Sequence, residues 1–444
     1  MLRSRSRVFV GQPRCSTLFS TRLGKFISSL SVLLDLHSWV AYRARFISGV
    51  NSMYKIRTHN AIAPIGLERF PSDGYAVNAE HDAPEALLIR SHKLAAEDLN
   101  PDLRAVARAG AGTNNVPVQA CSEKGIVVFN TPGANANSVK ELVITALLLA
   151  SRDVFGGIAY VRSLANVTDE AELNKLVEAE KKKFKGRELV GKTLGVVGLG
   201  AIGSMVARAG MDLGMNVLGY DPALSVDAAW RIPSQVERMQ NLPSLFAKAD
   251  FVSIHVPLLP ATEGMINEEA LKAFKPGSVL LNFARQPIVD SDALKAALAN
   301  GHLGRYVADF PVPGLLDHDR VMLTPHLGAS TDEAEENCAV MAADQLVRFL
   351  ETGSIVNSVN FPAVSADAVS GYRLAVSNHN VPGMLGQMTA VLAERNINVI
   401  DLINKSRDEL AYNLIDLSEA PDEGLLEAIR AIESVINVRV IQER

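Results

Sequence analysis

The chain has 444 residues, 48% hydrophobic and 21% charged, which is typical of a soluble globular protein and too long for a single hydrophobic core. Residues 1–52 have a charge balance of +7, so the rest of the chain carries −12, because the formal total is −5. That acidic body argues against a nucleic-acid partner. The three cysteines are widely spaced, so we predict neither a disulfide framework nor a metal site.

Residues 1–52 have the composition of a targeting segment. They are rich in Arg and Ser and contain one acid, Asp35, as organellar transit peptides do. We expect them to direct the protein to a mitochondrion or a plastid and to lie outside the folded domains; translation from Met53, giving a cytoplasmic protein, is the alternative. The apolar stretch Phe26–Val40 is interrupted by Asp35 and His37 and is short for a bilayer span, so no membrane segment is predicted.

After Tyr54 the chain changes to short apolar runs separated by Gly, Pro and Asn. These runs predict the strands Ala86–Ile89, Ala105–Ala107 and Gly125–Phe129, followed by the apolar helix Val139–Leu149. Residues 150–190 are charged and helical in character. They lead into the next apolar strand.

The segment Lys192–Asp221 predicts a dinucleotide site. The apolar strand Leu194–Val197 runs into a G-x-G-x-x-G turn, where the backbone can approach a pyrophosphate at a helix N-terminus. The glycines of the turn are Gly198, Gly200 and Gly203. The helix that follows has an apolar face at helical spacing, formed by Ile202, Val206, Ala209 and Leu213. Asp221 ends a second strand, where its carboxylate accepts hydrogen bonds from ribose hydroxyls and repels a 2′-phosphate. NAD is therefore predicted rather than NADP.

Strands continue to alternate with helices after Asp221, which indicates a parallel sheet. The predicted elements are the strands Phe251–Val256, Ser278–Asn282 and Tyr306–Phe310 and the helix Ser291–Asn300. The amphipathic helix Asp332–Leu350 is expected to run back to the first domain. We therefore expect an α/β protein with two Rossmann-like domains. One is a discontinuous substrate-binding domain of residues 53–148 and 326–360, and the other is an NAD-binding domain of residues 149–325.

A third domain follows the linker Ile355–Asp367, which contains Asn, Ser and Pro. Residues 371–444 predict the order strand, helix, strand, strand, helix, strand over Arg373–Val376, Gly383–Arg395, Asn398–Lys405, Leu410–Asp416, Glu423–Ile432 and Val435–Ile441. Two βαβ halves of this size predict a small ferredoxin-like α+β domain with a four-stranded antiparallel sheet.

Two side chains have the chemistry that hydride transfer to or from a hydroxy acid requires. Arg285 follows the strand Ser278–Asn282, at the edge where open α/β sheets bind ligands, and its planar fork suits a carboxylate. His326 lies between Pro325 and Gly328, in a segment that cannot be regular helix, and can carry a proton near neutral pH. Eight other histidines share that chemistry, so the residues alone do not select His326.

The motifs GLGAIG, NFAR, ADF and TPHLGAS occur in this order, together with RAGAGTNNVPV, FNTPGANANSV and HNVPGMLGQ. With them the chain resembles the D-2-hydroxyacid dehydrogenase family over about residues 54–444, in its short type with a C-terminal ACT domain. The resemblance implies NAD-dependent oxidation of 3-phospho-D-glycerate to 3-phosphohydroxypyruvate, the first step of the phosphorylated route to L-serine. Two alternatives stay open: a glyoxylate or hydroxypyruvate reductase of the same family, and a non-catalytic NADH-sensing binding protein.

The resemblance also implies roles for individual residues. Arg285 matches the arginine that binds substrate, His326 matches the general acid/base, and Arg90 and Arg108 match cations for the phosphorylated substrate. The positions that match cofactor contacts are Gly198, Gly200, Ala201, Ile202, Gly203, Asp221, Phe283, Ala284, Arg285, Asp309, His326, Leu327, Gly328 and Ala329.

The chain departs from the family near the histidine. The family usually has a glutamate that pairs with the histidine, whereas VADFPVPGLLDHD contains none. Asp309, Asp317 or Asp319 takes its place, or His326 works unpaired; we assign Asp309 primarily to the cofactor and only tentatively to catalysis. Gln286 is a second departure, because the family commonly has glycine after the arginine.

ACT domains bind amino acids where two such domains pair. The positions that match effector contacts are Asn378, Asn380 and Asn398, and L-serine is the predicted effector. Asn378 replaces a histidine that is typical of serine-inhibited enzymes, so a domain that only promotes oligomerisation is the alternative. The resemblance implies a homodimer through the nucleotide domain or a homotetramer through ACT pairing.

Overall fold

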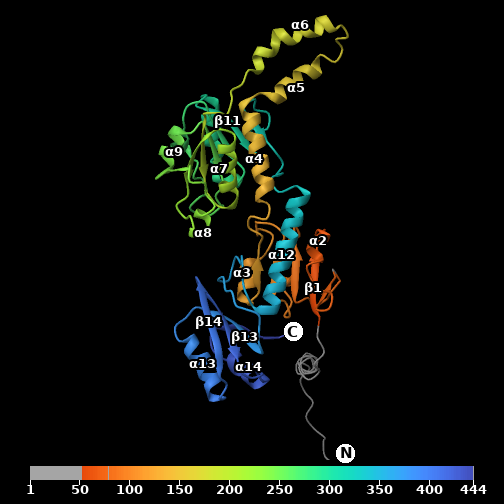
Figure 1. Ribbon diagram of the computed structural model, residues 1–444, viewed down its shortest axis with the longest axis vertical. Helices are drawn as coiled ribbons and strands as arrows, with labels where there is room; N and C mark the ends of the chain where they lie inside the picture. The colour runs from red at the N-terminus through yellow and green to blue at the C-terminus, as the bar shows by residue number, and fades with distance from the viewer. Residues whose placement is uncertain (1–52, 79, 444) are drawn as a thin grey trace, which may run out of the picture. The chain divides into compact units, whose positions relative to one another are not determined.

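The computed structural model describes residues 53–78 and 80–443, which contain three β-sheets (Figure 1). The predicted leader, residues 1–52, lies outside the described residues. Residues from Met53 onward form one compact unit.

The first sheet is parallel and has the strand order β2-β1-β3-β4-β5. Its elements are β1 (Tyr54–His59), α2 (Pro64–Leu67), β2 (Tyr75–Val77), β3 (Ala86–Ile89), η1 (Ala96–Asp98), β4 (Ala105–Arg108), α3 (Val118–Glu123) and β5 (Val127–Phe129). The three predicted strands are confirmed, the last with a start two residues later, whereas β1 and β2 have no counterpart among the predicted elements.

Hydrophobic layers cover both faces of this sheet. The long helix α12 (Asp332–Thr352) covers one face, where its Ala342 and Leu346 are buried together with Leu88. On the other face Leu87 and Ile89 form part of a separate cluster with residues of the η1 and α3 segments. The helix at 332–352 therefore returns to the first sheet, as its amphipathic pattern predicts.

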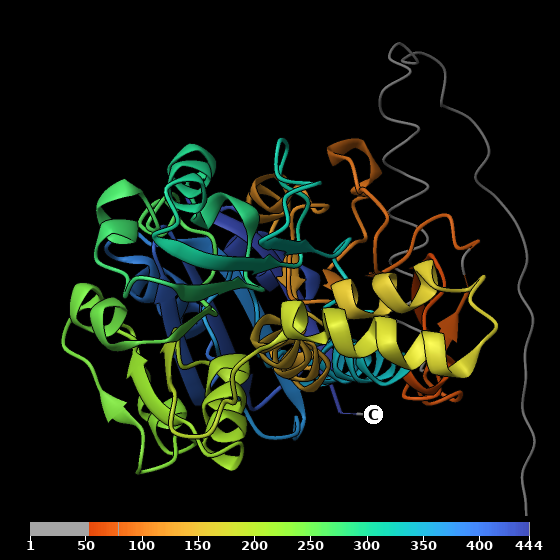
Figure 2. The same ribbon diagram turned by 90° about the horizontal axis from the view of Figure 1, so that it is seen from above.

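A helical segment connects the first sheet to the second. Helix α4 (Ala136–Ser151) confirms the predicted helix and buries Val143 and Leu147 in the core of the second sheet. The charged residues that follow fold as α5 (Val154–Ser163), α6 (Glu170–Glu180) and η2 (Lys181–Phe184). Helices α5 and α6, drawn in yellow in Figure 2, lie side by side, and the Tyr160 hydroxyl of α5 donates to the Leu176 carbonyl of α6 at 2.9 Å.

The second sheet has seven parallel strands in the order β12-β11-β10-β9-β6-β7-β8. Its elements are β6 (Thr193–Val197), α7 (Ala201–Asp212), β7 (Asn216–Tyr220), α8 (Val226–Ala229), β8 (Glu237–Arg238), α9 (Leu242–Lys248), β9 (Phe251–Ile254), α10 (Glu268–Lys272), β10 (Ser278–Asn282), η3 (Gln286–Ile288), α11 (Ser291–Ala299), β11 (Leu303–Ala308) and β12 (Val321–Leu323). The order reverses between β6 and β9, which is where doubly wound sheets bind ligands. The parallel sheet is confirmed, although β11 starts and ends earlier than the predicted Tyr306–Phe310.

The predicted apolar face of α7 packs on the core through Val206, Ile202 and Leu213, and small residues form its most buried part. Its buried positions are Gly203, Ser204, Val206, Ala207 and Gly210, whereas the predicted Ile202, Ala209 and Leu213 are only half-buried. Glycine at 210 lets the helix approach β6 closely, because a Cβ there would lie 2.7 Å from the Leu194 Cδ2 atom. Small residues define this contact, and a pattern of large apolar residues does not reveal it.

The third sheet is antiparallel, in the order β14-β15-β13-β16. Its elements are β13 (Tyr372–His379), α13 (Met384–Glu394), β14 (Val399–Arg407), β15 (Leu410–Leu417), α14 (Glu423–Arg430) and β16 (Val435–Gln442), so the predicted order is confirmed. Leu374 and Ile415 are buried with residues of α13 and α14 on one face. On the other face Ala375 and Tyr412 join the hydrophobic core of the first sheet.

Two arginines tie this third sheet to the C-terminal end of α12. Arg373 is buried, pairs with Asp416, and donates to the Thr352 carbonyl at 2.9 Å. Arg439 donates to the Phe349 carbonyl at 2.6 Å and lies 4.1 Å from the centre of the Phe349 ring. Cations at the last carbonyls of a helix are favourable, so both contacts stabilise the end of α12.

Candidate active site

The predicted glycine turn joins β6 to α7. Gly198 has a φ of +88°, and a Cβ on it would lie 2.6 Å from the His255 carbonyl oxygen, so the turn requires glycine. A Cβ on Gly203 would lie 1.9 Å from the Gly198 carbonyl oxygen. Gly200, by contrast, faces open space and precedes α7 without a side-chain cap. The turn therefore leaves room above a helix N-terminus whose amides can bind a pyrophosphate.

Asp221 lies at the end of β7, beside the glycine turn. Its two carboxylate oxygens accept hydrogen bonds from the backbone amides of Leu199 at 2.8 Å and Ala223 at 2.9 Å. Each oxygen keeps a lone pair for a ribose hydroxyl. The cavity beside it is lined by Tyr220, Asp221, Pro222, Arg238, Met239 and Gln240. The turn, the carboxylate and this cavity fit the pyrophosphate, ribose and adenine of NAD.

Arg285 follows β10, and a side chain at the end of that strand fixes the Arg285 backbone. Asn282, fully buried at the strand end, donates to the Arg285 carbonyl at 2.9 Å and accepts from the Ala284 amide at 3.2 Å. The predicted cofactor residues Phe283 and Ala284 are buried beneath the loop. Gln286 donates to the Ser291 hydroxyl at 3.1 Å, so the side chain that departs from the family anchors this loop to α11.

Two of the three predicted substrate arginines meet at one loop, and the third lies on the strand next to one of them. Arg90 and Arg108 lie at the carboxyl ends of the neighbouring strands β3 and β4, and Arg108 Nε donates to the Arg90 carbonyl at 3.1 Å. Arg108 Nη1 also donates to the Gly112 carbonyl at 2.7 Å. A Cβ on Gly112 would lie 3.4 Å from Arg108 Nη1 and 3.3 Å from Arg285 Nη2. Guanidinium groups from two different sheets therefore meet at Gly112.

This arginine cluster carries a net positive charge. Arg90 forms an ion pair with Glu335, in the first turn of α12, and Arg108 and Arg285 form none within the described residues. Burial, with the positive charges of Arg285 and Arg90, lowers the pKa of Arg108. Three cations against one carboxylate favour an anionic ligand.

His326 lies in the loop between β12 and α12. It has a φ of +61°, and its backbone amide donates to the Asp309 carbonyl at 3.0 Å. Its exposed ring packs against Phe310 with the ring centres 4.9 Å apart. Because β10, β11 and β12 are neighbours, Arg285, Asp309 and His326 all emerge at the same edge of the sheet.

The carboxylate of Asp309 holds the histidine loop in place. It is 2% exposed and accepts hydrogen bonds from the Thr324 hydroxyl at 2.6 Å and from the amides of Leu327 at 2.7 Å and Gly328 at 2.6 Å. On the other side of the loop, the Ser138 hydroxyl of α4 donates to the Gly328 carbonyl at 2.8 Å. We assign Asp309 to positioning the loop, and its contact with the cofactor stays a prediction.

No carboxylate replaces the family glutamate beside the imidazole. Among residues 53–78 and 80–443, His326 forms no ion pair and no bond from Asp309 reaches its ring. Asp317 and Asp319 lie exposed in the loop before β12. Of the alternatives drawn from the sequence, the unpaired histidine agrees best with this geometry. Leu327 is exposed and Ala329 half-buried, so the loop after His326 is open to a ligand.

Two polar residues near the cleft had no role assigned from the sequence. Asn135, which precedes α4, has a buried Oδ1 atom with no partner in the described chain, and a Cβ on nearby Gly133 would lie 3.1 Å from Ala201 Cβ. His255 follows β9 at the reversal point of the sheet, bonds to the Ser253 hydroxyl at 2.8 Å, and has its pKa lowered to about 3 by burial. Asn135 lies in the motif FNTPGANANSV. Its amide side chain in that motif is the sequence signal that could have identified it as a site residue.

The predicted effector residues are not brought together within one chain. Asn378 is buried: its Oδ1 accepts from Asn413 at 2.7 Å and its Nδ2 donates to the His379 carbonyl at 2.6 Å. Asn380 is exposed near the same end of β13 and donates to the Asp408 carbonyl at 3.1 Å. Asn398 is exposed before β14, at the opposite end of the sheet.

The described residues contain no group of three or more His, Cys, Asp or Glu arranged to hold a metal ion. Nor does any single described helix combine the length and hydropathy of a membrane span. Only the pair α4 and α5 meets that test together, and it bends by 64° at the break between them.

Comparisons with known proteins agree with this site. Residues 156–328 match the family model described as "D-isomer specific 2-hydroxyacid dehydrogenase, NAD binding domain", and residues 372–434 match the ACT domain. The chain is 35% identical over 343 residues to the D-3-phosphoglycerate dehydrogenase of Escherichia coli (strain K12), covering 74% of this chain and 79% of that protein. It is 34% identical to the D-3-phosphoglycerate dehydrogenase of Haemophilus influenzae, covering 77% and 82%.

Solved structures show the same fold. The NAD⁺-bound 3-phosphoglycerate dehydrogenase of Entamoeba histolytica is 27% identical with a TM-score of 0.56, covering 70% of this chain and 99% of that one. The D-mandelate dehydrogenase of Rhodotorula graminis is 25% identical with a TM-score of 0.58, covering 71% and 99%. Because the fold serves different substrates, the side chains of the cleft must decide which one is used.

Proposed function

The chain belongs to the D-3-phosphoglycerate dehydrogenases, within the D-isomer-specific 2-hydroxyacid dehydrogenase family, and from this premise we propose how its residues oxidise 3-phospho-D-glycerate. The observation that carries the proposal is the meeting of Arg108 and Arg285 at Gly112, with Arg90 close enough for its charge to lower the pKa of Arg108. A phosphorylated hydroxy acid has a carboxylate and a phosphate that need separate cations. The cluster supplies both within one cleft.

Arg285 binds the carboxylate and the oxygen on C2, because it emerges beside the histidine loop at the edge of the nucleotide-binding sheet. Arg90 and Arg108, at the strand ends of the other sheet, bind the phosphate. Arg90 must exchange its contact with Glu335 for the phosphate, or share it. Binding would hold the two sheets around the substrate and exclude water from the cleft.

His326 removes the proton from the C2 hydroxyl as the general base. The glycine turn and Asp221 would hold NAD⁺, which would supply the acceptor for the hydride of C2. Asp309 fixes the loop so that the imidazole keeps one position, and burial of that carboxylate keeps its three hydrogen bonds strong. In the reverse direction the protonated imidazole returns the proton to the carbonyl oxygen.

The test is NADH formation, measured by absorbance, with 3-phospho-D-glycerate and with unphosphorylated D-glycerate. We expect kcat/KM to favour the phosphorylated acid and Arg108→Gln to remove most of that preference. Arg69→Gln is the matched control, since Arg69 is an exposed arginine between α2 and β2, paired with Asp344. Equal activity on both acids, or a preference for glyoxylate with NADH, would support the reductase alternative, and no turnover of any 2-hydroxy acid would support the NADH-sensing one.

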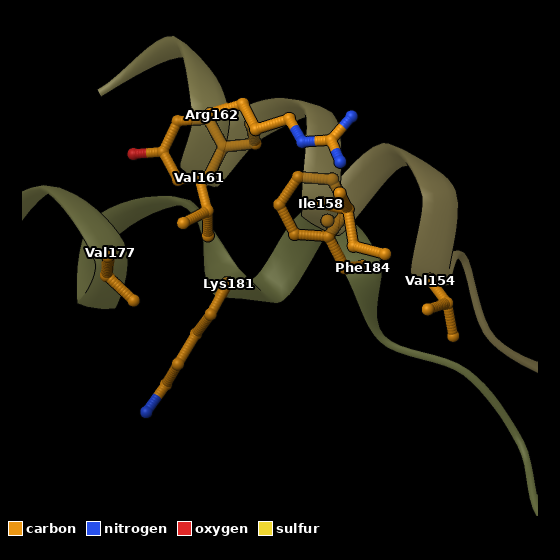
Figure 3. Close-up of a pocket in the computed structure, with 9 residues that line it drawn as sticks. Val154, Ile158, Val161, Arg162, Val177, Lys181 and Phe184 are labelled. Carbon is orange, nitrogen blue, oxygen red and sulfur yellow. The ribbon is translucent and has the colours of Figure 1, made fainter. Parts of the chain in front are cut away.

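We propose further that the protein is a homo-oligomer, joined in part through the α5–α6 hairpin. The hairpin has an apolar hollow whose lining includes Ile158, Val161 and Phe184 (Figure 3). Val161 is 56% exposed and Ile158 43% exposed. Contact with a second copy would bury these side chains, and light scattering of Val161→Asp should show a smaller species than the native chain.

We also propose that L-serine binds the ACT domain and that two copies of the domain complete the site. The separation of Asn398 from Asn380 along the sheet supports this reading. Calorimetry with serine and a rate assay in its presence test the proposal; no heat and no change in rate would leave oligomerisation as the role of the domain.

The remaining proposal concerns residues 1–52, which we assign to import into a mitochondrion or plastid on composition alone. Expression of the full chain and of a chain starting at Met53, each fused to a fluorescent protein, tests it. Identical cytoplasmic distribution of the two would rule out import.

A further inference from the structure

A second group of basic side chains lines a cavity in the domain of the first sheet. Its polar lining consists of Arg57, His59, Asp82, His92, Lys93, Asp98 and Asn100. Arg57 and His59 come from β1, whereas His92 and Lys93 come from the turn after β3. The cavity thus collects cations and imidazoles from two neighbouring strands.

The two imidazoles are stacked and held by their backbones. The ring centres of His59 and His92 are 4.2 Å apart, with 6° between the ring planes. The His92 amide donates to Asn60 Oδ1 at 2.6 Å, and the His92 carbonyl accepts from Asn115 Nδ2 at 2.7 Å. The stacking places the two imidazoles side by side at the cavity.

The basic groups of this cavity lack partners. Arg57 Nε is buried without a hydrogen bond, and neither Arg57 nor Lys93 forms an ion pair among the residues that the structure describes. Asp98 is exposed, and its Oδ2 already accepts from the Ala95 amide at 2.8 Å. Asp82 is exposed to water, which screens its charge. A buried guanidinium nitrogen without an acceptor is costly, so the cavity favours an anion.

The electrostatics of His59 agree with this reading. Burial lowers its pKa, and the neighbouring His92 and Arg57 lower it further, against the opposing effect of Asp98. The surroundings therefore disfavour a second positive charge, which an anion in the cavity would relieve.

This cavity is separate from the arginine cluster. Leu87, which lines it, belongs to the hydrophobic cluster on the face of the sheet away from α12. Arg90 pairs with Glu335 of α12, on the opposite face. The two sites share only the turn that carries Arg90 and His92, whose carbonyls both accept from Asn115.

We propose that this cavity is a second anion site, in which Arg57, Lys93 and the His59–His92 pair bind a phosphate group. A tetrahedral oxyanion suits donors that converge from several directions, and a planar carboxylate would reach fewer of them. The group comes from inorganic phosphate or from a phosphomonoester. The proposal does not depend on the reaction in the cleft.

The experiment follows the histidine ring signals of the full chain by NMR while phosphate is added. Signals of His59 and His92 are assigned with His59→Gln and His92→Gln. We expect both to shift in the native chain and in Arg285→Gln, which removes a cation of the cleft. In Arg57→Gln the phosphate affinity read from these shifts should fall about tenfold.

Two further measurements sharpen the result. Lys93→Gln, at an exposed position, should weaken binding even if Arg57→Gln folds poorly, whereas the exposed Lys185→Gln should not. Titration with glycerol 2-phosphate identifies the source: tighter binding than that of inorganic phosphate indicates a phosphomonoester. Shifts absent with both ligands up to about 10 mM, or unchanged in Arg57→Gln and Lys93→Gln, would overturn the proposal.

Discussion

The cleft and the C-terminal domain place their functional residues in opposite ways. In the cleft, the guanidinium groups of Arg108 and Arg285, from the ends of β4 and β10, meet at a single loop, and the Arg90 carbonyl accepts from Arg108. In the C-terminal domain, Asn380 and Asn398 lie at opposite ends of the sheet, and Asn378 is occupied by internal hydrogen bonds. The comparison teaches that one chain brings the predicted substrate arginines close together, whereas it leaves the predicted effector residues apart.

The largest effect that tests the cleft is expected for His326→Asn. Loss of the general base should lower kcat by about 10³ with little change in the KM for 3-phospho-D-glycerate. His379→Asn, at an exposed position of the C-terminal domain, is the control. Steady-state kinetics measure both. If kcat falls by only about tenfold or less, His326 is not the general base.

A second prediction concerns stability on the cofactor side of the cleft. Because burial lowers the pKa of His255 to about 3, the unfolded chain binds the proton first as the pH falls. The contribution of the neutral imidazole to the free energy of unfolding is complete above the ordinary histidine pKa of 6.5 and is lost as the pH falls toward 3. Between about pH 7 and pH 5 the native chain should lose at most about 2 kcal/mol through this group. Urea denaturation at both pH values should show a smaller loss in His255→Gln; equal losses would contradict the assignment.

Asp309→Asn tests whether this residue positions the loop or pairs with the imidazole. An amide keeps one acceptor oxygen but places an NH₂ group against a backbone amide, so kcat should fall about tenfold. The acidic limb of the pH–rate profile should stay in place, because no bond joins Asp309 to the ring. A shift of that limb in Asp309→Asn would restore Asp309 as the partner of His326. Asp317→Asn is the matched control.

Glu335→Gln sharpens the account of the arginine cluster. Removing the carboxylate frees Arg90 for the substrate, so the KM for 3-phospho-D-glycerate should fall about threefold with kcat nearly unchanged. The difference should shrink at high ionic strength, because the ion pair is partly exposed. Glu336→Gln, one position along α12, is the control. A raised KM would mean that Glu335 holds Arg90 in its binding position.

The smallest expected effect tests the other half of the comparison. Asn380→Ala and Asn398→Ala should each abolish serine binding in a homo-oligomer. Chains of the two variants, mixed in equal amounts and reassembled, should regain about a quarter of the sites, because about half of the interfaces pair one chain of each kind and one of the two sites there combines two native contacts. Calorimetry counts the sites. Recovery of none would show that each chain binds serine by itself.

What the sequence predicts well is local. The glycine turn, Asp221 and the strand before Arg285 lie within short segments whose spacing carries the geometry, and the structure places them as expected. The βαββαβ order of the third domain is likewise a property of consecutive elements.

What the sequence does not predict depends on contacts between distant segments. The close approach of α7 to β6 rests on Gly210, which an apolar pattern ignores. The role of Asp309 depends on three donors that arrive from residues 324–328, and the family resemblance pointed to the cofactor. The stacking of His59 on His92 joins two strand ends that are neighbours only in the folded sheet.

The docking of the third sheet on α12 has a consequence for how this protein can be altered. Tyr412 packs against Phe361, so the hydrophobic core of the first sheet continues into the third domain. Arg373 and Arg439 also donate hydrogen bonds to the last carbonyls of α12. Deleting residues 371–444 would expose aromatic rings to water and invite aggregation. Replacing this domain with another would require matching substitutions in α12, because the two share a core and hydrogen bonds.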